Sequence, residues 1–302
     1  TGVNNGAAFT GGAGDDTFIA TAATVATNTL NAGDNLTGGE GTDTLSVTAS
    51  IAGGSTVGTG VSSSGVEILS VNAVTATTVD TTLMTGVTDL YNNASLADTT
   101  YTGLKAIPNV WLTGTSADTT LGYAAAATTA GTADEQTVKL NGAAASSSAT
   151  ITTNGIESIT VDASGTASGA ITRPVILTSD SLKSVTITGD AASAISANLT
   201  GATTLDAGSI TGNDAANTVL LTADAADTIT VDLGKGNDVL SITSIGATHT
   251  IAGGDGVDSL VAGTSITATT GANISGFEVV SAGAVSVTLP AASNTIGTVS
   301  FT

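Results

Sequence analysis

The sequence predicts an all-β chain wound as a parallel β-solenoid, and three observations lead to that fold class. Segments that alternate apolar and small polar residues recur along the chain, a pattern typical of strands with one buried face. Stretches rich in Gly, Asp, Asn, Ser and Thr separate these segments, and such residues favour turns. No segment shows the 3.6-residue period of an amphipathic helix.

A strand signature carries the first observation. Its best copies are SGVEILSV at 64–71, NGIESITV at 154–161 and SGFEVVSA at 275–282, and looser copies are TGVTDLYN at 85–92 and SLKSVTIT at 181–188. Glu67, Glu157 and Glu278 occupy the same position of the three best copies. We expect these glutamates to face solvent beside their strands.

A glycine–aspartate repeat carries the second observation. Its best copies are GGAGDDTFI at 11–19, GGEGTDTLS at 38–46, LGKGNDVLS at 233–241 and GGDGVDSLV at 253–261. Weaker copies are NAGDNLT at 31–37, GNDAANTVL at 212–220 and TADAADTIT at 222–230. The simplest explanation is a glycine-rich turn capped by an aspartate, and we prefer that explanation for 212–220, where most glycines are lost.

Repeats of short strands and tight turns favour a solenoid, because one coil cannot bury its inner face alone and stacked coils can. A series of β-sandwich-like segments is the alternative for the middle of the chain, where the repeat period drifts. We expect four segments, namely a first glycine–aspartate roll at 1–47, a Thr/Ala/Gly-rich solenoid at 48–210, a second roll at 211–263 and a terminal β segment at 264–302.

The composition points to a thin core. Of 302 residues, 41% are hydrophobic but only 3% are aromatic, so small and β-branched side chains must fill the interior. Three tyrosines and the single tryptophan fall within 91–123. We expect these aromatic residues to fill the core locally, with a sugar-binding patch or a subunit contact as alternatives.

Charge and missing motifs exclude several function classes. Five basic residues and a net charge of −20 cannot support binding to a phosphate backbone. Cysteine is absent, which excludes disulfides and thiolate metal sites, and no apolar run approaches the roughly 18 residues of a membrane span. The chain begins at Thr1 without a signal-like segment, so we expect a fragment or a mature piece of a longer protein.

Enzyme activity is not expected. The sequence has no Gly-x-Ser-x-Gly elbow and no His-Glu-x-x-His motif. His249 is the only histidine, and we expect it on the surface rather than in a catalytic site. Composition alone leaves a paired-carboxylate glycosidase open.

The pattern Gly-Gly-x-Gly-x-Asp-x-apolar-x resembles the nonapeptide of RTX proteins, the hemolysin-type calcium-binding repeat. The match is close at 11–19, 38–46 and 253–261 and departs at one position in 233–241. In that family six residues form a calcium-binding turn and three form a strand, and two nonapeptides complete one coil of a right-handed parallel β-roll. The resemblance therefore implies Ca²⁺ as the cofactor, bound by glycine-turn carbonyls and aspartate carboxylates. It assigns metal binding to Gly12, Gly14, Asp16, Asp34, Gly39, Gly41, Asp43, Asp227, Gly234, Gly236, Asp238, Gly254, Gly256 and Asp258.

This ligand set makes chemical sense only if coils share an ion. Calcium takes six to eight oxygen ligands at about 2.3–2.6 Å, more than one nine-residue loop offers. With two nonapeptides per coil, Asp16 and Asp34 should lie on one edge of the roll and Asp43 on the opposite edge from Asp34. A further role for Glu67, Glu157 and Glu278 as calcium ligands or lattice contacts is the alternative to exposed strand residues.

A broader resemblance links the chain to the RTX-type surface-layer proteins of Gram-negative bacteria. In those proteins a glycine–aspartate unit precedes a strand signature, as 38–47 precedes 64–71 and 253–261 precedes 275–282 here. The resemblance implies type I secretion, an extracellular location on the bacterial cell surface, and calcium-dependent self-assembly into a two-dimensional lattice. The implied partner is the chain itself, with cell-surface polysaccharide contacted through a region outside this sequence.

A calcium-stiffened segment of an RTX adhesin is the alternative to the surface layer. Adhesin spacers share the same sequence style, but a pure spacer should repeat more strictly than this chain does at 76–150. That irregularity favours the lattice subunit.

Overall fold

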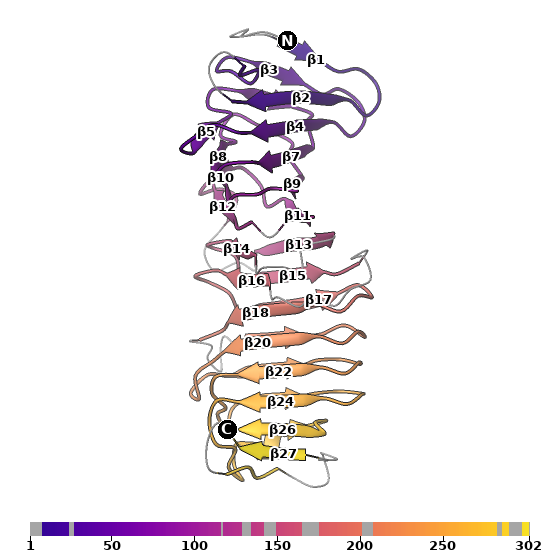
Figure 1. Cartoon of the computed structure of the whole chain (residues 1–302), viewed down its shortest axis with the longest axis vertical. Helices are drawn as coiled ribbons and strands as arrows, with labels where there is room; N and C mark the ends of the chain where they lie inside the picture. Colours follow the sequence, from indigo (N-terminus) through magenta and orange to yellow (C-terminus); the bar gives the residue numbers. More distant parts are fainter. Residues whose placement is uncertain are drawn as a thin grey trace. The chain divides into compact units, whose positions relative to one another are not determined.

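The computed structural model describes residues 8–23, 27–115, 117–128, 134–141, 149–164, 175–200, 208–282, 286–289 and 298–301. These residues form an all-β structure in which parallel strands stack as a β-solenoid, consistent with a right-handed β-roll (Figure 1). The predicted fold class is confirmed. The chain divides into two compact units, Thr1–Ile156 and Glu157–Thr302.

The first unit contains three parallel sheets. One has the order β1 (Ala8–Thr10), β3 (Asn35–Thr37), β6 (Ser62–Ser64). The second has the order β5 (Ser55–Val57), β8 (Thr77–Asp80), β10 (Thr99–Leu104), β12 (Thr119–Tyr123), β14 (Thr150–Thr152). The third has the order β2 (Thr17–Ala22), β4 (Thr44–Ala49), β7 (Ile68–Ala73), β9 (Asp89–Asn93), β11 (Asn109–Thr113), β13 (Glu135–Asn141).

The second unit alternates between two parallel sheets. One has the order β15 (Ser158–Asp162), β17 (Ser184–Thr188), β19 (Gly208–Thr211), β21 (Ile229–Asp232), β23 (Thr250–Ala252), β25 (Ile274–Ser275). The other has the order β16 (Val175–Thr178), β18 (Ala194–Asn198), β20 (Thr218–Thr222), β22 (Val239–Ile242), β24 (Ser259–Ala262), β26 (Val279–Ala282), β27 (Thr298–Phe301).

Parallel pairing decides against the β-sandwich alternative for the middle segment. Every described pairing of the strands within 48–210 is parallel and joins elements one coil apart. The helical content of the described residues is one 3₁₀ turn, Gly271–Asn273, and none of these residues belongs to a helix that is long and apolar enough to cross a bilayer. The boundaries of the four expected segments remain predictions.

The core consists of stacked aliphatic columns. In the first unit Leu45, Leu69 and Leu90 pair in register on β4, β7 and β9 and are buried. In the second unit Leu240 and Leu260 do the same on β22 and β24. Strand residues between the buried ones point outward and are mostly Ser, Thr and Asn, so a thin core suffices, as the composition indicated.

Coil length departs from the resemblance. Thr17 pairs with Thr44, so the first coil takes 27 residues rather than 18, and the next takes 24, because Thr44 pairs with Ile68. Each coil is longer because β2 and β4 span six residues instead of three and because further turns separate the strands.

The longer coil corrects the expected edge geometry. Asp16 and Asp43 precede the neighbouring strands β2 and β4, so these two aspartates lie on one edge, one coil apart. Asp34 precedes β3, in a different sheet. The expectation that Asp16 and Asp34 share an edge is therefore wrong.

Two of the aromatic residues are not core fillers. Tyr101 is fully buried as expected, but Tyr91 and Trp111 lie half-buried on the outward face of β9 and β11. Their rings stack with centroids 5.0 Å apart and planes 5° apart, and Lys139 Nζ lies 4.7 Å from the centre of the Trp111 ring. Because Tyr91 and Lys139 occupy both faces of the indole, the tryptophan offers no open platform for a sugar.

The position of His249 also differs from the expectation. The side chain is 1% exposed rather than on the surface. Its Nε2 lies 3.1 Å from the carbonyl oxygen of Asp224 in the neighbouring coil. Burial lowers the pKa of this imidazole, so His249 is a neutral core residue at pH 7.

Replacing Leu90 by Ala should lower the free energy of unfolding by about 2–5 kcal/mol, because the substitution leaves a cavity in a stacked column. Leu96→Ala is the matched control, since Leu96 is 81% exposed and should change stability by less than about 0.5 kcal/mol. Urea unfolding at fixed calcium measures both variants. An equal loss of unfolding free energy in the two variants would contradict the description of Leu90 as part of a stacked aliphatic core.

Candidate metal centres

Two columns of acidic side chains run along the edges of the solenoid where strands begin. The first column contains Asp16, Asp43 and Glu67, which directly precede β2, β4 and β7. The second column contains Asp238, Asp258 and Glu278, which directly precede β22, β24 and β26, and Asn217 occupies the equivalent position before β20. Members of a column are one coil apart.

Hydrogen bonds connect the members of the first column. The backbone N–H of Asp16 donates to Oδ1 of Asp43 at 2.7 Å. The N–H of Asp43 in turn donates to Oε2 of Glu67 at 2.8 Å. Asp43 and Glu67 each thus use one carboxylate oxygen to bind the coil before it.

The second column repeats this arrangement. The N–H of Asn217 donates to Oδ1 of Asp238 at 2.5 Å, and the N–H of Asp238 donates to Oδ1 of Asp258 at 2.8 Å. The N–H of Asp258 donates to Oε2 of Glu278 at 2.8 Å. Both columns therefore end on a glutamate.

The second carboxylate oxygen of three aspartates has no protein partner. Oδ2 of Asp43, Asp238 and Asp258 is buried and accepts no hydrogen bond, and the three residues are fully buried. An unpaired buried charge costs several kcal/mol. Three equivalent buried oxygens are therefore available to bind a positively charged group.

The glycine turns bring a second oxygen close to two of these carboxylates. A Cβ placed on Gly38 would overlap both Oδ2 of Asp43 and the carbonyl oxygen of Gly65. A Cβ on Gly253 would likewise meet Oδ2 of Asp258 and the carbonyl oxygen of Gly276. In each case a carboxylate oxygen and a carbonyl oxygen of the next coil lie close together beside the glycine, and both are ligand types that a hard cation accepts.

Asn217 provides an internal comparison. Its backbone joins the second column as the aspartates do, but its side chain is neutral. Its Oδ1 accepts a hydrogen bond from Ser193 Oγ at 3.2 Å, and its Nδ2 donates to the carbonyl oxygen of Ala215 at 2.7 Å. Where the column carries an amide, the amide is satisfied by protein, which agrees with the turn preferred for 212–220.

The donor chemistry fits a calcium ion. Carboxylate and backbone carbonyl oxygens are hard ligands that suit Ca²⁺ and not a soft metal. Among the described residues, no group of three or more His, Cys, Asp or Glu side chains could hold a metal. Calcium takes six to eight oxygen ligands, so a calcium ion at these turns would need backbone carbonyl oxygens as well as carboxylates.

The turns are stacked closely enough to supply those carbonyls. The N–H of Glu40 donates to the carbonyl oxygen of Gly12 at 3.0 Å, and the N–H of Asp255 donates to that of Gly234 at 3.0 Å. The third motif glycine of each copy has a positive φ, which other residues avoid; these glycines are Gly14, Gly41, Gly236 and Gly256.

Three of the assigned aspartates differ from Asp43, Asp238 and Asp258, because their Oδ2 atoms accept hydrogen bonds from backbone N–H groups. Asp16 is half-exposed, and its Oδ2 accepts the N–H of Gly12 at 2.6 Å. Asp34 and Asp227 lie outside the two columns, where their Oδ2 atoms accept the N–H groups of Asn31 at 2.8 Å and Asp224 at 2.6 Å. The turn-capping explanation fits Asp34 and Asp227, and their assignment to calcium remains a prediction.

Glu67 and Glu278 are column members for which the sequence analysis gave calcium binding only as the alternative. They were expected to face solvent, but both are half-buried and both accept an aspartate N–H. The available signal was the order of motifs, because each strand signature follows a glycine–aspartate turn by one coil. The third glutamate, Glu157, is buried, so the expectation of exposure is wrong for it too.

Burial raises the pKa of the second column's aspartates. The pKa of Asp238 rises to about 6, mainly through desolvation and further through the charge of Asp258. The pKa of Asp258 is raised by desolvation and by the charges of Glu278 and Asp255. Both raised pKa values reflect the free-energy cost of ionising a carboxyl group that is buried and has no positively charged partner among the described residues.

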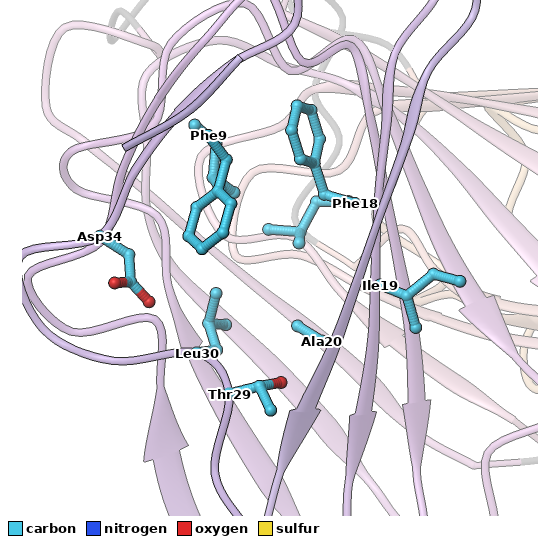
Figure 2. Close-up of a pocket in the computed structure, with 9 residues that line it drawn as sticks. Phe9, Phe18, Ile19, Ala20, Thr29, Leu30 and Asp34 are labelled. Atoms are coloured by element: carbon cyan, nitrogen blue, oxygen red, sulfur yellow. The ribbon is translucent and has the colours of Figure 1, made fainter. Parts of the chain in front are cut away.

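A hollow of about 250 Å³ lies beside β1 and β2 and is lined mostly by apolar side chains, including Phe9, Phe18 and Leu30 (Figure 2). Asp34 is the one carboxylate in its lining. Glycosidase chemistry needs two opposed carboxyl groups. This hollow does not supply that pair.

The chain matches no protein-family model, no curated protein and no solved structure. The two columns and the fold therefore carry the functional argument.

In EGTA, Asp238→Asn should gain stability relative to the original chain as the pH rises from about 4 to about 7. The folded pKa of Asp238 is about 6 against a reference value of 3.8, so the folded state of the original chain binds an extra proton in this range and loses stability as that proton leaves. Thermal melts of both chains across the range measure the difference. A constant difference would contradict the raised pKa.

Proposed function

We propose that this chain is a calcium-binding structural protein that forms part of a bacterial surface layer. In this proposal Ca²⁺ rigidifies the solenoid and promotes contacts between copies of the chain, which assemble into a two-dimensional lattice outside the cell after secretion. The observation that carries the calcium part is the set of three buried Oδ2 atoms without a protein partner, at Asp43, Asp238 and Asp258.

Net charge supports a cation-dependent fold. The chain carries −20, and the columns concentrate part of that charge inside the structure. Self-repulsion disfavours the compact state without cations. An ion that binds the folded chain and not the unfolded chain stabilises it by mass action, so folding and calcium binding should be coupled.

The proposal that copies of the chain form a lattice rests on the sequence resemblance and on exposed apolar side chains. Large apolar side chains are exposed at Ile19, Leu96 and Val257, where contacts between copies would cover them. Coils of 20 to 28 residues, as in the pairings of β9 with β11 and of β11 with β13, are less uniform than a plain spacer requires. A catalytic role has no place in this proposal.

Calcium titration of the purified chain tests the proposal in two steps. Circular dichroism should show β-structure whose melting temperature rises with Ca²⁺ and falls in EGTA, and electron microscopy of the calcium-loaded samples should show planar sheets or closed rings. Calcium-dependent folding without assembly would move the proposal to an adhesin spacer. An equally folded chain in EGTA that binds no Ca²⁺ would overturn the calcium role.

Asp258→Asn should change stability in opposite directions with and without calcium. In EGTA the variant should be at least as stable as the original chain, since an amide N–H can face the carbonyl oxygen of Gly276 as Asn217 faces that of Ala215. With calcium the variant should need about tenfold more Ca²⁺ for half-maximal stabilisation, because a charged ligand is lost.

Asp255→Asn is the matched control for that experiment. Asp255 lies in the same turn and is exposed, so the substitution removes an equal charge close to the column without removing a side chain of the column. Differential scanning calorimetry across calcium concentrations compares the variants. Identical calcium dependence in the two would remove Asp258 from the proposed ligands.

A further inference from the structure

The strand signature forms the same turn in both units, directly after the last glycine–aspartate turn of each column. In the first unit this turn is Ser64–Glu67, and in the second it is Ser275–Glu278. We refer to both as S-G-x-E turns. Gly65 and Gly276 adopt left-handed φ values of 60° and 71°, so the two turns share their backbone conformation.

The backbone contacts of the two S-G-x-E turns also match. The carbonyl oxygens of Ser64 and Ser275 each accept the N–H of the first motif glycine, Gly38 and Gly253, at 2.9 Å. The N–H groups of the glutamates donate back to the preceding aspartate carbonyls, at 3.0 Å in the first unit and 3.1 Å in the second. Two independent copies of one geometry argue for a common purpose.

Each S-G-x-E turn brings two oxygens to the aspartate of the coil before it. The Gly65 carbonyl oxygen converges with the unpartnered Oδ2 of Asp43 on the position of a Gly38 Cβ. The Glu67 carboxylate accepts the Asp43 N–H through Oε2 alone. Gly276 and Glu278 stand in the same relation to Asp258.

This contact brings like charges together without a basic partner. Among the described residues, no lysine or arginine forms an ion pair with Asp43, Glu67, Asp258 or Glu278. Two stacked carboxylates repel each other in a partly buried setting. A cation held between the coils would offset this repulsion.

We infer that each S-G-x-E turn is the closing half of a divalent-cation site, in which Gly65 and Glu67 complete the site of Asp43, and Gly276 and Glu278 complete the site of Asp258. The glycine supplies its carbonyl oxygen, and the glutamate supplies negative charge while it positions the aspartate through the N–H···Oε2 hydrogen bond. This inference rests on the proposed calcium function and assigns to the strand signature a role that the nonapeptide pattern does not contain.

The structure also explains why the closing residue is a glutamate. In a glycine–aspartate turn the first glycine precedes the acid by five residues, as Gly38 precedes Asp43. In an S-G-x-E turn the glycine precedes the acid by two residues. The shorter turn has fewer carbonyls to offer, and the longer side chain reaches the same Asp N–H at the same distance of 2.8 Å that links Asp238 to Asp258.

Glu67→Gln, Glu278→Gln and the control Glu40→Gln test the inference on the full chain. Glu40 is exposed in the glycine turn of Asp43, so its substitution removes an equal charge close to the site. Equilibrium dialysis with ⁴⁵Ca²⁺ counts bound ions, and calorimetric titration gives affinities. We expect each column variant to lose one ion or to weaken it at least about tenfold, and Glu40→Gln to match the original chain.

The variant Asp43→Asn separates this inference from the proposed function. If Asp43→Asn loses an ion and Glu67→Gln behaves like Glu40→Gln, the closing role is overturned while calcium binding stands. If the original chain binds no ion in dialysis, both are overturned. Should Glu67→Gln fail to fold at saturating Ca²⁺, Glu67→Asp provides the measurement, because it keeps the charge and shortens the reach; unchanged affinity in that variant would overturn the positioning role.

Discussion

The structure depends on one constraint, a buried carboxylate oxygen that has no hydrogen-bond donor. At Asp43, Asp238 and Asp258 one oxygen binds the backbone of the preceding coil and the other has no hydrogen-bond partner. At Asp43 and Asp258 that second oxygen lies beside a glycine. The first contact fixes the register between coils. The second oxygen is the atom that we propose binds a cation, so in that proposal the same side chain both builds the stack and links its stability to an ion.

The glycines follow from this constraint rather than from flexibility. Gly38 and Gly253 leave room for a carboxylate and a carbonyl of the next coil, and any side chain would displace both oxygens. The aliphatic columns behind the turns, such as Leu240 over Leu260, supply the burial that holds neighbouring coils at strand spacing. Packing therefore sets the distance across which the oxygens meet.

Sequence patterns predicted the parallel solenoid and the turns, because two-residue alternation and glycine spacing are local properties. They did not predict the coil length, because a nine-residue motif does not fix how many residues lie between its copies; this is why Asp34 was expected beside Asp16. Glu67 and Glu278 were expected to face solvent because their contact lies one coil away, and only the order of the motifs along the chain indicates it. His249 was misplaced because its partner, the Asp224 carbonyl, also belongs to another coil.

The direction of the hydrogen bonds has a mechanical meaning. Bonds between parallel strands run from coil to coil, so tension along a stack loads successive coils in series and the weakest junction opens first. In the first unit the junction between β4 and β7 carries the Asp43–Glu67 contact, whereas the junction between β9 and β11 carries side-chain contacts such as the bond from Trp111 Nε1 to Asp89. A cation would strengthen the junction between β4 and β7. The junction between β9 and β11 would then set the force at which that unit opens.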